Sequence, residues 1–265
     1  MGKFSGILLC TDFDGTLAVS AHVVEKNKAA IEYFKQNGGL FSIITGRSVQ
    51  FLKERENEVA CNTYIGGVNG TIIYDVPNSK VICEEFIAGD IIDRLKQVRK
   101  RIYNIKDILI FNRNGSIVIH SSTDDFDTQL KDAFRVPVYK FLIHGLQPFT
   151  EEECAQTSAI VGDGYELSRS WASGIEGQNR GVNKGATARK IAELTGARLL
   201  VCVGYYENDI SMIKQADIGY AVENAIPSLK EAADRVTVSV HEGAIAAVIE
   251  DIERDLSARK IEVEL

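Results

Sequence analysis

The sequence predicts an α/β protein: a doubly wound parallel sheet with an inserted α+β domain. In the first and last thirds of the 265 residues, short apolar runs alternate with helical segments, which is typical of parallel strands covered by helices on both faces. The middle third carries asparagine–glycine pairs between strand-like runs, which is typical of antiparallel hairpins. We therefore predict a discontinuous core domain at residues 1–77 and 182–265 and an inserted domain at residues 78–181.

The first third of the chain contains two expected strand–helix pairs. Ile7–Thr11 is an apolar run of the length of a buried strand. Glu25–Asn37 follows as a helix that ends at Gly38, because glycine readily takes the left-handed backbone angles of a helix cap. Leu40–Ile44 and Ser48–Glu58 repeat the pair as strand and helix.

The middle third is expected to be mainly antiparallel. Asn69-Gly70 and Asn114-Gly115 are turn signals, and Asp90 stands where it can cap a helix whose apolar residues recur at helical spacing. The expected elements, in order, are strands Thr63–Ile65, Thr71–Tyr74 and Val81–Phe86, the helix after Asp90, strands Ile108–Phe111, Ser116–His120 and Val138–His144, a helix at Glu151–Thr157, and strands Tyr165–Ser170 and Gly174–Gln178.

The last third returns to alternating strands and helices. Pro227 stands in the first turn of one expected helix, a position that suits proline. The expected elements are helix Lys184–Leu194, strand Leu199–Val203, helix Asp209–Gln215, strand Ile218–Ala221, helix Pro227–Ala233, strand Val236–Val238, and a final helix with Ile245, Val248, Ile249 and Ile252 as its buried stripe.

Composition and charge argue against several classes of partner. The net charge of -7 disfavours a nucleic acid or a membrane surface as the general partner. No apolar run approaches the length of a membrane span, and the N-terminal segment lacks the pattern of a secretory signal. The five cysteines are scattered, without Cys-x-x-Cys spacing, which fits reduced intracellular thiols. We therefore expect a cytoplasmic protein.

Two carboxylates stand at the end of the first expected strand. Asp12 and Asp14 are two residues apart, so their side chains point to the same side of an extended segment. Gly15 lets the chain turn directly after them. Such a pair can hold a divalent cation and present one carboxylate as a nucleophile.

Polar residues also follow the other core strands. Ligands of an open parallel sheet bind at the carboxyl ends of its strands, so these residues are expected to meet at one edge. A lysine at the start of a helix adds free backbone N–H groups that favour anions. The candidates are, in order, Thr45, Gly46 and Arg47, then Lys184, then Asn208 and Asp209.

Together these residues suit phosphoryl transfer, in which catalysis consists mainly of positioning and charge neutralisation. Asp12 is expected to attack phosphorus and form an aspartyl-phosphate. Asp14 is expected to protonate the leaving oxygen and then to activate water. Thr45 would donate to a phosphoryl oxygen, and Lys184 would neutralise both that oxygen and Asp12.

The roles of three further residues stay open. Gly46, Arg47 and Asn208 are expected phosphate-binding residues. Arg47 has a competing role in an ion pair within the fold. Asn208 and Asp209 have a competing role as caps of the helix that follows them.

Four short motifs stand in register: Asp-Phe-Asp-Gly-Thr-Leu at 12–17, Ile-Thr-Gly-Arg at 44–47, Lys-Gly at 184–185 and Gly-x-x-x-Asn-Asp at 204–209. With these motifs the chain resembles the haloacid dehalogenase superfamily, and more narrowly its Cof-type phosphatases, which carry an α/β cap between the second and third motifs. The resemblance implies a Rossmann-like core and phosphatase activity on small phosphorylated metabolites such as sugar phosphates. It also implies Mg²⁺ held by the Asp12 side chain, the Asp14 backbone carbonyl and Asp209.

One position departs from the family pattern. The fourth motif usually has an aspartate directly after its glycine, and that residue normally touches the metal; here it is Tyr205. A phenol, with an ordinary pKa of about 10, is a poor Mg²⁺ ligand at neutral pH. Asp209 remains, and Glu207 offers a carboxylate at a different spacing. Weaker metal binding is the expected minimum.

Three functions remain open at this point. The first is a Mg²⁺-dependent phosphatase, and the second is a phosphomutase that returns the phosphoryl group to a sugar. The third is a non-catalytic protein that binds a phosphorylated metabolite and has lost the metal through Tyr205. The chain length and the large insertion before Lys184 argue against a receiver-type phospho-aspartate domain. Neither the individual substrate nor the oligomeric state follows from the sequence.

Overall fold

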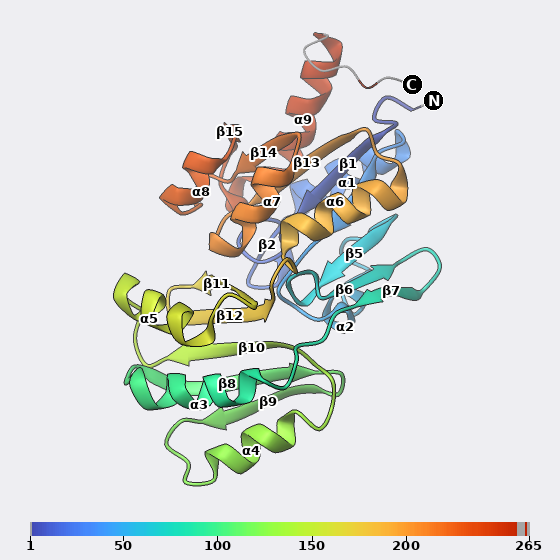
Figure 1. Ribbon diagram of the computed structural model, residues 1–265. Helices are drawn as coiled ribbons and strands as arrows, with labels where there is room; N and C mark the ends of the chain where they lie inside the picture. Colours follow the sequence, from blue (N-terminus) through green and yellow to red (C-terminus); the bar gives the residue numbers. More distant parts are fainter. Residues whose placement is uncertain (1, 259–262, 264–265) are drawn as a thin grey trace. The chain divides into compact units, whose positions relative to one another are not determined.

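The chain divides into two compact units in the computed structural model, which describes residues 2–258 and 263 (Figure 1). The first unit is formed by the chain up to Cys83 and from Lys184 onward, and the second by Glu84–Asn183. The insertion predicted from the sequence, residues 78–181, begins and ends a few residues earlier.

The first unit is built on a five-stranded parallel sheet. Its strand order is β15–β14–β13–β1–β4, so the first strand of the chain lies inside the sheet. All five residues of this strand are buried, which explains why it reads as an unbroken apolar run. The strands are β1 (Ile7–Thr11), β4 (Leu40–Ile43), β13 (Leu199–Gly204), β14 (Ile218–Ala221) and β15 (Arg235–Val236).

Helices cover both faces of this sheet, which confirms the predicted doubly wound fold. Helices α6 and α7 pack together on one face, and α1 and α9 pack together on the other (Figure 1). Among the described residues, no helix is both long and apolar enough to cross a membrane. The helices of this unit are α1 (Glu25–Gln36), α2 (Val49–Lys53), α6 (Lys184–Thr195), α7 (Ile210–Gln215), α8 (Pro227–Ala232) and α9 (Ala244–Ser257), with 3₁₀ turns η1 (Val68–Gly70), η2 (Glu207–Asp209) and η3 (Val240–Glu242).

Two small antiparallel sheets complete the first unit. Strands β5 (Tyr64–Gly67), β6 (Ile72–Asp75) and β7 (Lys80–Glu84) form one, and β2 (Ala18–Val19) and β3 (His22–Val23) form the other. A single bridge between Ile44 and Gly66 connects β5 to the chain just after β4. The β5–β7 sheet therefore extends from the edge of the core sheet.

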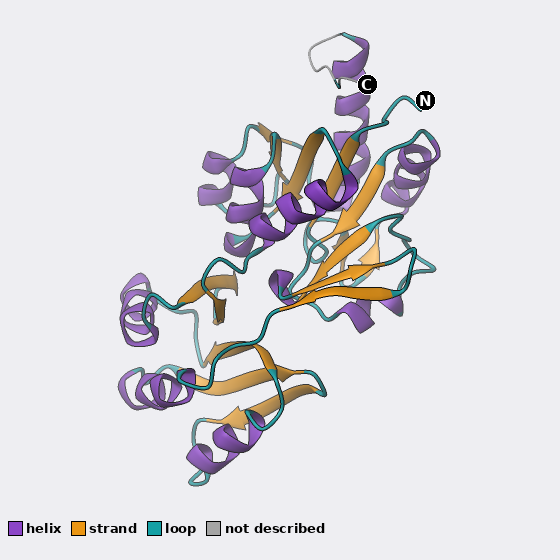
Figure 2. Cartoon of the chain, turned by 45° about the vertical axis from the view of Figure 1, so that its right-hand side comes forward, coloured by secondary structure: helices purple, strands orange, loops and turns teal. Residues whose placement is uncertain are grey.

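The inserted unit is an α+β fold, as predicted. Its antiparallel sheet has the order β11–β12–β10–β8–β9, and its helices pack on one face of that sheet around a shared apolar core (Figure 2). The other elements of the chain are β8 (Ile105–Asn112), β9 (Gly115–His120), β10 (Val138–Gly145), β11 (Tyr165–Trp171), β12 (Gly174–Asn179), α3 (Ile91–Arg101), α4 (Phe126–Ala133) and α5 (Glu151–Val161).

Two predicted local features were wrong, and one helix was missed. The helix expected at Ser48–Glu58 ends at Lys53, because the following turns bring Val59 back against the core. Helix α4 was not predicted, although Phe126 and Leu130 point from it into the core of the inserted unit. Asp90 stands at the N-cap of α3, but its side chain accepts a hydrogen bond from the Tyr165 hydroxyl (2.6 Å) instead of capping the helix.

Candidate active site

The centre of the candidate site is a lysine between two aspartates. Asp12 follows β1, Asp209 lies in the loop after β13, and Lys184 is the first residue of α6. The Lys184 Nζ donates to Asp12 Oδ1 at 2.7 Å and to Asp209 Oδ1 at 2.6 Å. All three residues are at most 4% exposed. Asp12 and Asp209 thus follow the carboxyl ends of the neighbouring parallel strands β1 and β13, and Lys184, 172 positions after Asp12, joins them from the start of a helix.

Burial and charge set the electrostatics of this cluster. Burial raises the pKa of Asp12 to about 7; the nearby charge of Asp209 adds to this, and Lys184 opposes it. For Lys184, burial lowers the pKa, but the two carboxylates outweigh burial and the net pKa is raised. One ammonium cannot balance two ionised carboxylates, and the raised pKa of Asp12 reflects this excess of negative charge, which favours the arrival of a cation or of a proton.

The turn after Asp12 needs a glycine for two reasons. Gly15 has φ +76°, in the left-handed region, and the Tyr205 ring would lie 3.0 Å from a Cβ at this position. The turn is held by two hydrogen bonds: the Gly15 N–H donates to Ala18 O at 3.0 Å, and Asn224 Nδ2 donates to Gly15 O at 3.0 Å. Tyr205 therefore packs directly against the loop that carries Asp12 and Asp14.

Asp14 is engaged by Arg47. The guanidinium donates through Nε to Asp14 Oδ2 at 2.8 Å and through Nη2 to Asp14 Oδ1 at 3.1 Å, and it also lies over the Phe51 ring. The structure thus shows the ion pair that was one of the two open roles of Arg47. Both side chains remain partly exposed, so this pair lies at the solvent side of the buried cluster.

Thr45, Asn69 and Asn208 form a second hydrogen-bonded group. Thr45 Oγ1 accepts from the Arg47 N–H at 3.2 Å, which leaves the hydroxyl hydrogen able to donate elsewhere. The Asn69 N–H donates to Thr45 O at 2.8 Å, and Asn208 Nδ2 donates to Asn69 Oδ1 at 3.4 Å. Gly46 lies between Thr45 and Arg47 in the same loop. All sequence-predicted residues are therefore in the first unit.

The residues around Asp12 offer few protein ligands for a magnesium ion. The described residues hold no cluster of three or more His, Cys, Asp or Glu side chains suited to a metal. Asp209 Oδ1 accepts from Lys184, and Asp209 Oδ2 accepts from the Tyr205 and Tyr206 N–H groups at 2.9 and 3.1 Å. Burial, then the charges of Asp12 and Asp209, raise the pKa of Tyr205, so its phenol is neutral.

Of the oxygens that the resemblance assigns to the metal, Asp12 Oδ2 and the Asp14 carbonyl are the ones engaged neither by Lys184 nor by the N–H groups that bind Asp209. Asp12 Oδ2 has one long hydrogen bond, from Thr16 Oγ1 at 3.5 Å. Mg²⁺ is commonly bound by one or two carboxylates, substrate phosphate oxygens and several waters, so these two oxygens are compatible with it. With both its oxygens engaged, Asp209 fits an indirect role through a water better than direct ligation.

Three supporting residues were not predicted from the sequence. Thr16 contacts Asp12, Asn224 holds the Gly15 carbonyl, and the Ser211 hydroxyl accepts from the Gly185 N–H at 3.2 Å at the start of α6. A sequence signal existed for Asn224, since it follows the carboxyl end of β14 as the other candidates follow their strands. Thr16 lies within the first motif but had no predicted role, and Ser211 carried no signal of its own.

Comparison with known proteins identifies the family of this chain. A family model described as haloacid dehalogenase-like hydrolase matches residues 9–249. The chain belongs to this family. The resemblance inferred from the four motifs is thereby confirmed.

Known relatives of this chain are named phosphatases. The chain is 25% identical over 251 residues to 5-amino-6-(5-phospho-D-ribitylamino)uracil phosphatase YcsE of Bacillus subtilis, covering 91% of this chain and 94% of the relative. It is 25% identical to phosphoglycolate phosphatase 2 of Saccharolobus solfataricus, covering 93% and 92%. A solved sugar phosphatase of HAD subclass IIB shares the fold, with a TM-score of 0.78 at 21% identity over 92% of this chain and 98% of that chain.

Proposed function

We propose that this protein is a Mg²⁺-dependent phosphatase that acts on small phosphorylated metabolites, such as sugar phosphates, through an aspartyl-phosphate on Asp12. The observation that carries this proposal is the buried contact of Lys184 with both Asp12 and Asp209. An ammonium 2.7 Å from the nucleophile orients it and offsets the charge of an arriving phosphoryl group. The relatives named as phosphatases support the same reaction class.

The proposed reaction has two steps. In the first, an Asp12 oxygen bonds to phosphorus while the bond from phosphorus to the ester oxygen breaks, and Asp14 gives a proton to that leaving oxygen. In the second, Asp14 takes a proton from water, whose oxygen attacks phosphorus. Inorganic phosphate leaves, and the Asp12 carboxylate is restored.

Other residues bind the phosphoryl group and position the general acid Asp14. The Thr45 hydroxyl donates to a phosphoryl oxygen, because its own oxygen already accepts from the Arg47 N–H. Gly46 and Asn208 are the further phosphate-binding residues of this proposal. Arg47 pairs with ionised Asp14 in this structure, so Asp14 must leave that ion pair and take up a proton before it can protonate the leaving oxygen.

In this proposal the Asp12 carboxylate and the Asp14 carbonyl would bind Mg²⁺ directly, and Asp209 would bind it through a water. When bound, Mg²⁺ would offset negative charge on Asp12 and on the phosphoryl oxygens. The excess negative charge of the Lys184 cluster supports a cation at this place. We also propose a cytoplasmic location, since all five cysteines are free thiols.

The test is phosphate release from a panel of phosphomonoesters in excess Mg²⁺, with wild type and Asp12→Asn compared. We expect release by wild type that Asp12→Asn abolishes. Equal release by the two proteins would reject the proposed nucleophile.

A second candidate function is binding of a phosphorylated metabolite without turnover. The observation that favours it is Tyr205, a neutral phenol against Gly15 in the position where a metal-binding aspartate is expected. The same assay separates the two functions when Tyr205→Asp is added. Release by Tyr205→Asp with none by wild type would support the binding protein, and comparable release by both would exclude it.

A further inference from the structure

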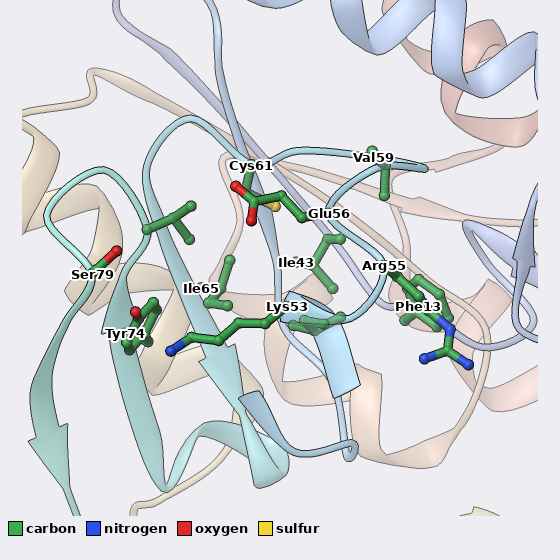
Figure 3. Close-up of a pocket in the computed structure, with 12 residues that line it drawn as sticks. Phe13, Ile43, Lys53, Arg55, Glu56, Val59, Cys61, Ile65, Tyr74 and Ser79 are labelled. Carbon is green, nitrogen blue, oxygen red and sulfur yellow. The ribbon is translucent and has the colours of Figure 1, made fainter. Parts of the chain in front are cut away.

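A cavity lies beside the loop that carries Asp12 and Asp14. Phe13 stands between the two aspartates, so its side chain points away from them and forms part of the cavity wall (Figure 3). The cavity has a volume of about 200 Å³. Its apolar wall comes from β4, α2, β5 and the segment after α2, and includes Ile43, Leu52, Val59 and Ile65.

The cavity is separate from the candidate active site. Of the described residues, those that line it include neither Asp12, Lys184 nor Asp209. It lies entirely within the first unit, since its lining runs from Phe13 to Ser79. Phe13 is the one residue that the catalytic loop contributes to the described lining, and its side chain is fully buried.

One end of the cavity is polar and cationic. Figure 3 shows the Lys53 side chain reaching toward Tyr74, with Ser79 beyond it, and the Lys53 Nζ lies 4.0 Å from the centre of the Tyr74 ring. Hydrogen bonds from Lys53 and Ser79 lower the pKa of Tyr74. The contact that the structure gives the Lys53 ammonium is with the Tyr74 ring. Glu56 also lines the cavity; its carboxylate lies toward Cys61, and its charge acts on both Cys61 and Tyr74. An anion can therefore reach the Lys53 ammonium.

The size and lining restrict the ligand. An engineered apolar cavity of about 150 Å³ is known to hold benzene, so a cavity of this size suits a body of roughly six to ten non-hydrogen atoms. An apolar wall with an ammonium and two hydroxyls at one end matches a small amphipathic anion. We propose that this cavity is a second ligand site, which binds a small aromatic or aliphatic carboxylate with its apolar body against Leu52 and Val59 and its carboxylate at Lys53.

The test uses 4-fluorobenzoate as probe and fluorine NMR as readout. We expect binding by wild type with a Kd on the order of 1 mM, as suits a ligand of this size in a preformed pocket. Saturating inorganic phosphate, which addresses the active site, should leave this binding unchanged. Absence of binding up to about ten times that Kd, or displacement by phosphate, would overturn the proposal.

Variants of the wall and of the polar end locate the probe. Val59→Phe fills the cavity and should weaken binding about tenfold or more, and Val76→Phe, at a half-buried lining position, does the same where Val59→Phe fails to fold. Lys53→Gln should weaken 4-fluorobenzoate about three- to tenfold but leave neutral 4-fluorobenzyl alcohol unaffected. Lys190→Gln, an exposed lysine on α6, is the matched control. Unchanged binding in a folded cavity-filling variant would contradict the site.

Discussion

Lys184 and Lys140 are both buried, one in each compact unit, and their surroundings differ. Lys140 on β10 donates to Glu176 on β12, and the other oxygen of Glu176 accepts from the neutral hydroxyl of Ser170 at 2.6 Å. Lys184 instead lies between two carboxylates. In the inserted unit the buried lysine thus pairs with one carboxylate. In the core unit the buried lysine is shared by two carboxylates, so negative charge is in excess.

The difference separates a structural role from a chemical one. A buried ion pair is tolerated when its charges and hydrogen bonds are satisfied, and it contributes little to net stability. An uncompensated buried charge lowers the stability of the fold. Groups of this kind concentrate at functional sites. We interpret Lys140–Glu176 as part of the inserted fold and the Lys184 cluster as a site prepared for a cation and a phosphoryl group.

The largest expected effect comes from Asp12→Asn. Removal of the nucleophile should lower turnover about 10⁴-fold or more. The free energy of unfolding should rise, because the variant removes one of the two carboxylates that share Lys184. Phosphate release and urea denaturation measure the two effects. A variant that is inactive but markedly less stable would contradict the interpretation of excess charge.

Lys184→Met should impair both chemistry and stability. Asp12 and Asp209 would remain buried without their ammonium, which is expected to cost about 3–5 kcal/mol of stability. Turnover should fall about 10²–10³-fold in the folded fraction, because charge stabilisation is lost. Lys190→Met, an exposed position on the same helix, is the control and should change neither. A stable, active Lys184→Met protein would remove the basis of the comparison.

Glu176→Gln tests the other side of the comparison. It leaves Lys140 buried without its carboxylate and should lower stability by about 3 kcal/mol. Glu152→Gln, at an exposed position on α5, should have no measurable effect and serves as control. Urea denaturation curves of the two variants and of wild type measure the free energy of unfolding. Equal stability would mean that Lys140 is satisfied without Glu176.

Tyr205→Asp should have the smallest effect of the four, and on the metal. A carboxylate at this position should raise Mg²⁺ affinity about 10–100-fold, the range associated with residues that support a metal site. Titration calorimetry measures affinity independently of turnover. Tyr205→Phe keeps the ring against Gly15 without adding charge and should bind Mg²⁺ as wild type does. Equal affinity in all three proteins would mean that position 205 does not face the metal.

The core of the fold was predictable because its signals are local. The strands β1 and β14 occupy the predicted residues, since short apolar runs between polar ends leave little choice of register. The buried stripe expected for the last helix is observed on α9, at Ile245 and three further residues. In contrast, α2 was predicted too long because the pattern does not show where the chain turns back after Lys53.

The candidate site was predictable as a set of residues but not as a set of contacts. The position of Asp12, Lys184 and Asp209 at strand and helix ends followed from topology. That Asp14 is held by Arg47, and that Asn224 holds Gly15, depends on side-chain directions across separate loops. The cavity beside Phe13 could not be predicted from the sequence either, because its shape depends on how side chains from separate segments pack together.

The central claim is that Asp12 carries the phosphoryl group, and trapping that intermediate tests it most directly. Wild-type protein is mixed with a sugar phosphate and Mg²⁺, quenched in acid within the first turnover, reduced with tritiated borohydride, which converts an aspartyl-phosphate into stable labelled homoserine, and digested with trypsin. We predict label in the peptide Phe4–Lys26, which contains Asp12, and none in that peptide from Asp12→Asn. Steady release of phosphate with no label in this peptide, by wild type and by Asp12→Asn alike, would contradict the account.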